Sequence, residues 1–95
     1  MTFKPAARLE FFEAIAWYEG RQPGLGLDFA RKVIQALQRA RQKPELFPKV
    51  RGARKLRLKR FNRYSIYFAV KEETFSGIAV FHSSRNPAEL RRWLR

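Results

Sequence analysis

The residues best suited to chemistry in this sequence are basic and lie close together in the second half of the chain. Residues 49–63 contain eight lysines and arginines and no acidic residue, and so supply more than half of the net charge of +13. A field of one sign that is so concentrated attracts a polyanion such as RNA or DNA, or an acidic protein partner. The segment is therefore the first candidate for a binding surface.

Part of this charge follows a two-residue period. Lys55, Arg57 and Lys59 alternate with two leucines, so on a β-strand they project from one face at intervals of about 6–7 Å, close to the spacing of phosphates along a nucleic-acid strand. The alternative is a solvated face whose long side chains cover apolar surface. We predict that the segment faces a ligand, because no acid is interleaved with its bases. The bases that flank the row are Arg51, Arg54, Arg60 and Arg63.

A second candidate is the sequence His82-Ser83-Ser84-Arg85, at the predicted end of a strand and just before a helix. His82 could move protons, and Arg85 could stabilise the charge of a phosphorane-like transition state. The alternative, which we favour for His82, is a bond to a neighbouring backbone group. For Arg85, ligand binding and pairing with Glu89 both stay open. The candidate target- or nucleic-acid-binding residues are Arg54, Lys55, Arg57, Lys59, Arg60, Arg63 and Arg85.

Other kinds of site are not expected. One histidine and no cysteine argue against a conventional metal centre and against a disulfide framework. There is no glycine-rich phosphate-binding loop and no serine-hydrolase motif. The carboxylates are scattered, with Glu10 and Glu13 expected on a helix surface and Glu72 and Glu73 in a turn. We therefore predict no metal and no cofactor.

Three aromatic residues receive structural interpretations. Tyr67 is expected on the more polar face of its strand, where it could stack on a base, but a half-buried structural tyrosine is the favoured interpretation. Trp17 and Trp93 are interpreted as anchors of the core or of an interface.

Two helices precede the basic segment. A short strand at Thr2-Phe3-Lys4 is followed by a helical pattern from Ala6 to about Glu19, with Gly20 as its stop. Its expected apolar face consists of Leu9, Phe12, Ile15, Ala16 and Glu19, widened by Phe11 and Tyr18. A second helix is predicted from about Leu25 to Gln42, ended by Pro44. Its expected buried stripe is Phe29, Ala30, Val33, Leu37 and Ala40.

In the rest of the chain, apolar residues recur with the two-residue period of β-strands. Residues 44–53 are predicted to form a loop, 55–59 a strand with one buried face, and 64–70 and 75–82 a hairpin joined by a polar turn. Asn86, Pro87 and Glu89 have the pattern of a capped helix start, so a short final helix is expected to bury Leu90, Trp93 and Leu94. Two helices followed by a three-stranded antiparallel meander indicate an α+β domain.

Length and composition set the outer limits. The 95 residues, 45% of them hydrophobic, suit a single domain over 1–95. No stretch has the roughly 18 apolar residues that a membrane span requires, and the first residues lack the apolar core of a signal peptide. We therefore expect a cytoplasmic protein without a membrane segment.

Several of these patterns occur together in one known family. The segments that carry the resemblance are Trp17-Tyr18, residues 25–29, the Pro-containing segment 43–48, Arg54, residues 60–68, and residues 78–87 with His82, Arg85 and Pro87. Their order and spacing resemble the RelE/ParE toxin superfamily of type II toxin–antitoxin systems, and the ParE-type members more closely. The resemblance covers nearly the whole chain.

The resemblance implies a fold and a partner. The fold is a β-α-α-β-β-β core, in which two N-terminal helices pack on an antiparallel sheet, with a short C-terminal helix. The partner is a cognate antitoxin with an acidic C-terminal segment that wraps the toxin, which suits the strongly basic character of this chain. Members of this kind serve plasmid stabilization and growth inhibition.

Three functions are compatible with the resemblance. ParE-like members poison DNA gyrase without a hydrolytic site, and this is the favoured function. RelE-like members are ribosome-dependent mRNA endoribonucleases; the candidate catalytic residues would then be Arg57, Lys59, Arg63, His82 and Arg85. The C-terminal tyrosine of the ribonucleases is absent, and Asn62-Arg63 replaces a frequent proline. A non-toxic nucleic-acid-binding module ranks third.

Overall fold

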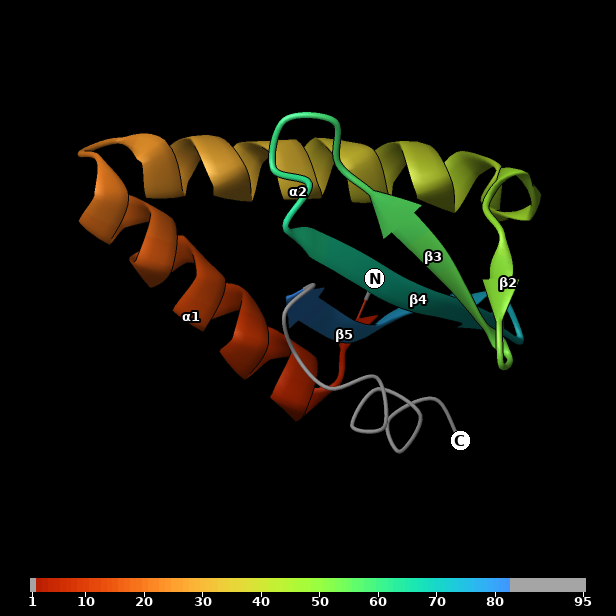
Figure 1. Cartoon of the computed structure of the whole chain (residues 1–95). Coiled ribbons are helices and arrows are strands. Elements are labelled where there is room, and N and C mark those ends of the chain that lie inside the picture. Colours follow the sequence, from red (N-terminus) through yellow and green to blue (C-terminus); the bar gives the residue numbers. More distant parts are fainter. Residues whose placement is uncertain (1, 83–95) are drawn as a thin grey trace.

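The computed structural model describes residues 2–82 and contains one strand, two helices and then four strands (Figure 1). The elements are β1 (Thr2–Phe3), α1 (Pro5–Arg21), α2 (Leu25–Gln42), a 3-10 turn η1 (Pro44–Leu46), β2 (Lys49–Val50), β3 (Ala53–Arg57), β4 (Tyr64–Lys71) and β5 (Thr74–His82). The α+β class is confirmed. The predicted final helix, with Arg85, Leu90, Trp93 and Leu94, lies outside the described residues.

The five strands form one sheet in the order β1-β5-β4-β3-β2. All neighbours are antiparallel except β1 and β5, which are parallel. The predicted β4–β5 hairpin is confirmed, with Tyr64 opposite His82 and Lys71 opposite Thr74. A register irregularity after Tyr67 leaves Ile78 as an extra residue of β5.

The prediction of a loop over residues 44–53 was wrong, because this segment contains η1 and β2. Val50 and Ala53 pair across a two-residue turn in which Arg51 and Gly52 have φ angles of 50° and 84°. Positive φ at both central residues matches the twist of a tight hairpin. β2 therefore adds a fourth strand after the helices, giving the order β-α-α-β-β-β-β.

The main core lies between the helices and one face of the sheet, which we call the helix-covered face. The largest fully buried side chains are Phe29, Val33, Leu37, Leu56, Ile66, Phe68 and Val80. The predicted stripe of α2 is confirmed at Phe29, Val33, Leu37 and Ala40, while Ala30 is half-buried.

The predicted apolar face of α1 was wrong at Leu9 and Phe12, which are 60% and 59% exposed. It is confirmed at Tyr18, which is buried, and Phe11 and Ile15 are half-buried against the core. Apolar residues surround most of this helix, so their spacing alone does not select a buried side. The helix also continues through Gly20 to Arg21.

Glu10 was predicted on a helix surface and is instead buried. Its Oε1 accepts a hydrogen bond of 3.1 Å from the backbone N–H of Val80. β1 pairs only with Ser76 and Gly77, so farther along this edge of β5 a carboxylate from α1 takes the place of a strand neighbour. Burial of the carboxylate is compensated by this bond to the backbone.

β1 is short but closely fitted. Phe3 lies opposite Gly77, and its ring occupies the space that any side chain at Gly77 would need. The N–H of Lys4 donates to the Gly77 carbonyl at 2.9 Å, and the ring of Phe3 stacks on Phe11 of α1. β1 therefore fastens the start of α1 to the edge of the sheet.

Candidate functional site

The basic segment 49–63 is divided by the fold among three places. Part of it lies on the sheet face opposite the helices, which we call the outer face. One arginine is used inside the structure, and two others reach a pocket beside α1. The charge that is continuous in the sequence is therefore not one continuous surface.

Lys55 and Arg57 lie on the outer face. In the register of β3 and β4, Lys55 is opposite Tyr67 and Arg57 is opposite Ser65. Lys59 follows the end of β3 in an exposed bend, so the predicted strand row of three bases stops at Arg57. The strand runs from Ala53 to Arg57 rather than over 55–59.

The outer face also has an apolar cluster of its own, consisting of Ala53, Tyr67, Ile78, Ala79 and Phe81. Tyr67 is only 4% exposed, so the expectation of a half-buried tyrosine was wrong. Burial raises the pKa of the Tyr67 phenol above its ordinary value, and the charge of Arg57 partly opposes this. The outer face therefore places a neutral phenol beside a guanidinium.

Arg54 points to the other side of the sheet. It lies opposite Phe68, and its Nη1 donates to the carbonyl oxygen of Phe47 at 2.7 Å. The ring of Phe47 in turn packs edge-on against Phe68. Arg54 thus ties the segment after η1 to β3, while Arg51 lies exposed in the β2–β3 turn.

Arg60 and Arg63 reach a pocket at the C-terminal end of α1, which we call the Trp17 pocket. It has a volume of about 330 Å³. Its lining residues are Trp17, Tyr18, Arg21, Leu25, Arg60, Asn62 and Arg63. The guanidinium carbons of Arg21 and Arg63 lie 4.5 Å and 5.6 Å from the centre of the Trp17 ring. Both distances are within the range of cation–π attraction.

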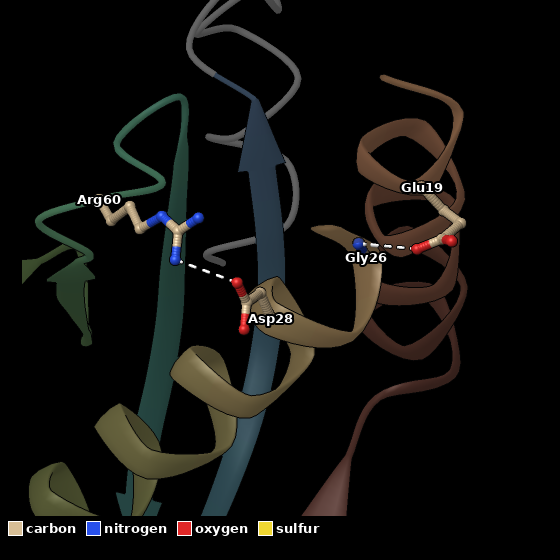
Figure 2. Close-up of polar contacts among 4 residues, drawn as sticks. All are labelled: Glu19, Gly26, Asp28 and Arg60. Atoms are coloured by element: carbon tan, nitrogen blue, oxygen red, sulfur yellow. Dashed lines mark hydrogen bonds and ion pairs between the residues drawn. The ribbon is translucent and has the colours of Figure 1, made fainter. Parts of the chain in front are cut away.

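Two carboxylates tie together the elements around this pocket; Figure 2 shows the contact of Asp28 with Arg60 and that of Glu19 with Gly26. Asp28 of α2 pairs with Nη1 of Arg60 at 3.1 Å, which connects the β3–β4 loop to the first turn of α2. Glu19 of α1 accepts the N–H groups of Gly24 and Gly26 at 2.9 Å and 3.0 Å. Glu19 therefore caps the N-terminus of α2, rather than extending the apolar face of α1 as predicted.

The turn between the helices has little freedom to change. A side chain at Gly26 would meet the carbonyl oxygen of Ile15 at 2.6 Å, and Gly24 has a φ of +87°. Arg21, at the end of α1, and Leu25, at the start of α2, both line the pocket on the two sides of this turn.

Tyr18 forms the buried part of the pocket wall. Burial raises the pKa of its phenol above the ordinary value, Tyr64 raises it further, and Arg63 lowers it. Tyr18 is thus neutral at physiological pH.

His82 lies on the helix-covered face. Its ring is 4.9 Å from that of Tyr64 and 6.3 Å from that of Trp17, measured between centroids. Lys55 and Arg57 are on the outer face, so His82 does not converge with them on one site. Arg85, the other candidate of this motif, lies outside the described residues.

Sequence reasoning did not identify Arg21 as a functional candidate. The signal was its spacing, because a residue four positions after Trp17 lies one helical turn away on the same side. Trp17, interpreted as an anchor, is half-buried and lines the pocket.

Comparison with known proteins gives no assignment. No family model matches this chain, and no curated protein matches its sequence. Among residues 2–82 there is no helix with the length and apolar character needed to cross a membrane. The same residues contain no group of three histidine, cysteine or acidic side chains placed to hold a metal ion.

Proposed function

We propose that this chain is the toxin of a type II toxin–antitoxin pair, of the RelE/ParE superfamily, and that it inhibits growth by binding DNA gyrase in the cytoplasm. The observation that carries the choice of binding over catalysis is the separation of His82, on the helix-covered face, from Arg57 on the outer face. The observed order, β-α-α-β-β-β-β, is compatible with the β-α-α-β-β-β core that the resemblance implies and adds one short strand, β2.

A nuclease that used the predicted residues would need them at one phosphate. General acid–base catalysis requires the proton-transferring group within hydrogen-bond reach of the reacting atoms. His82 packs against Trp17 and Tyr64 under α1, whereas Arg57 is beside Tyr67 on the outer face. This separation favours a toxin that acts through its surface.

A partner surface is available on the helices. Leu9 and Phe12 of α1 and Leu27 and Ile34 of α2 are large apolar side chains with between 44% and 60% exposure. An antitoxin with an acidic C-terminal segment would combine apolar contacts of this kind with the positive charge of the chain. The antitoxin is thus the expected tight partner.

An mRNA endoribonuclease acting on the ribosome is the second candidate. It is favoured by one observation, the presence of Lys55, Arg57 and the neutral phenol of Tyr67 on the same face. The two bases could hold a phosphate and stabilise its developing charge without His82.

The test is to express the chain alone from a tightly repressed promoter and to follow DNA, RNA and protein synthesis by short isotope pulses. Gyrase inhibition predicts that DNA synthesis falls first, together with a DNA-damage response. Early collapse of protein synthesis with newly cut messages contradicts gyrase inhibition and supports the nuclease. Unchanged growth contradicts the toxin assignment itself.

A pair of double variants sharpens this test. Lys55→Ala with Arg57→Ala removes the outer-face bases, and Lys32→Ala with Arg39→Ala removes two exposed bases of α2 as a matched control for charge. The nuclease predicts that only the first pair abolishes message cleavage. Equal loss of growth inhibition in both pairs indicates a dependence on overall charge.

A further inference from the structure

The Trp17 pocket brings together three guanidinium groups from separate elements. Arg21 comes from the last turn of α1, and Arg60 and Arg63 come from the β3–β4 loop. Between them lies the indole of Trp17, with Arg21 and Arg63 within 6 Å of its ring centre. Like charges repel, so their convergence favours a bound anion.

The charge of the pocket is only partly compensated. In residues 2–82 the one salt bridge joins Arg60 to Asp28, so Arg21 and Arg63 bring two positive charges without a carboxylate of their own. A single carboxylate carries one negative charge, whereas a phosphate monoester carries about −1.5 to −2 at neutral pH. The planar guanidinium also binds phosphate oxygens in pairs. The charge therefore suits a phosphate monoester.

The pocket is larger than a phosphate needs. It is an open hollow with a volume of about 330 Å³. Part of its wall is apolar or aromatic, from Trp17, Tyr18 and Leu25. This combination suits a planar organic group attached to the anion.

We propose that the Trp17 pocket binds the phosphate of a nucleotide, either free or at the end of a nucleic-acid strand. Arg21 and Arg63 contact the phosphate, and the nucleoside lies against the aromatic and aliphatic wall. Arg60, fixed by Asp28, closes the loop side of the pocket.

Two contacts join the elements around the pocket. The Glu19 carboxylate accepts the N–H groups of Gly24 and Gly26 in the turn from α1 to α2, and Arg60 pairs with Asp28 of α2. Figure 2 shows the Glu19–Gly26 and Arg60–Asp28 contacts. Preorganisation of this kind lowers the cost of binding.

This inference does not rest on the proposed toxin activity. The pocket contains Arg60 and Arg63 from the candidate residues of the sequence, but neither Lys55 nor Arg57, which lie on the outer face. A chain that fails to inhibit growth can therefore still bind a nucleotide, and an inhibitory chain can lack nucleotide binding.

The test is calorimetric titration of the full chain with AMP, adenosine and inorganic phosphate, at two salt concentrations. We expect AMP to bind with one site per chain and at least about tenfold more tightly than either fragment, because only AMP fills both halves of the pocket. Adenosine binding as tightly as AMP would overturn the role of the arginines. A hexaglutamate peptide that binds more tightly than AMP would identify a site for acidic protein instead.

The source of the phosphate is tested with oligoadenylate tetramers with and without a 5′-phosphate. Tight binding of the phosphorylated tetramer alone indicates a strand end, and tight binding of AMP alone indicates a free nucleotide. Failure of AMP and of the phosphorylated tetramer to bind overturns the proposal.

The site is located by matched variants. Arg21→Ala with Arg63→Ala should weaken AMP binding at least about tenfold, because charge-assisted bonds are lost. Arg31→Ala with Arg41→Ala removes the same charge from exposed positions of α2 and should weaken it less than about threefold. Equal weakening overturns the assignment to the pocket.

A conservative pair guards against loss of folding. Arg21→Lys with Arg63→Lys keeps the charge but removes the planar fork, so intermediate affinity is expected. Affinity equal to that of the unsubstituted chain would contradict paired contacts to phosphate.

Discussion

The two faces of the sheet both bury aromatic side chains, but they treat charged groups differently. On the helix-covered face, Arg54 is bonded to the Phe47 carbonyl and Glu10 to the N–H of Val80. On the outer face, Lys55 and Arg57 lie next to Tyr67 and Ser65, and neither forms an ion pair with an acid within residues 2–82. The charged groups of the helix-covered face are hydrogen-bonded to the backbone, whereas those of the outer face are available to a partner.

This difference shows that a basic residue cannot be assigned a role from its charge alone. Arg54 and Lys55 are neighbours in the sequence, yet β3 directs them to opposite sides. Substitutions on the helix-covered face should therefore change stability, and substitutions on the outer face should change binding.

The largest effect is expected for Phe68→Ala. Phe68 is fully buried and packs against Phe47 and Phe75, so its truncation should lower the free energy of unfolding by about 3–5 kcal/mol. Urea denaturation measures this change. Val70→Ala on the same strand is the control, because Val70 is 45% exposed and should cost less than about 1 kcal/mol. Similar losses for both would contradict a dominant helix-covered core.

The next effect is expected for Glu10→Ala. The substitution leaves the N–H of Val80 without this acceptor and should cost about 1–3 kcal/mol. Glu13→Ala, on the exposed side of the same helix, should stay within about 0.5 kcal/mol. Both changes in stability are measured by urea denaturation. If the two glutamates behave alike, the bond to the sheet edge does not stabilise the fold.

A smaller effect separates Arg54 from Arg57. Arg54→Ala removes a bond to a carbonyl and should lower stability by about 0.5–1.5 kcal/mol. Arg57→Ala should leave stability nearly unchanged and weaken growth inhibition if the outer face binds the target. Denaturation and a growth assay are made on both variants. A stability loss confined to Arg57→Ala would reverse the assignment of the two faces.

The smallest effect concerns alkaline pH. Burial raises the pKa of the Tyr67 phenol in the folded state above its ordinary value of 10.0. The resulting contribution to stability is fully present below pH 10.0 and is lost as the pH rises through the folded-state pKa. Tyr67→Phe should therefore lose less stability than the unsubstituted chain between pH 9 and 11. Identical slopes of unfolding free energy against pH would show that burial of the phenol does not affect its titration.

The sequence predicted the elements whose hydrophobic pattern reflects contact with one core only. α2 has one apolar stripe against one core, so its buried residues follow from a period of 3.6, and the β4–β5 hairpin follows from alternation around a short polar turn. α1 contacts both α2 and the sheet and exposes Leu9 and Phe12, so its pattern predicted a helix but not its buried side.

The candidate site was less predictable, because it depends on contacts between distant residues. The row of bases indicated Lys55 and Arg57 together, and β3 does place them on one face. The sequence does not show that Arg54 is bonded inside the structure and that Arg63 reaches Trp17. These roles depend on where β3 ends and on the position of Asp28. Glu10 was missed because a carboxylate between apolar residues has the same pattern whether it meets water or a sheet edge.

The pairing of β1 with β5 has a consequence for synthesis. The hydroxyls of Thr2 and Ser76 lie 3.0 Å apart although 74 positions separate them in the chain. Contacts between such distant segments form late, because a long loop must close first. While the chain emerges from the ribosome, Phe3 has no Gly77 to cover and Glu10 has no Val80 to bond until β5 has been made. The native sheet is thus completed only after nearly all of the described residues have been translated, and an interrupted product lacks the strand on which both β1 and α1 dock.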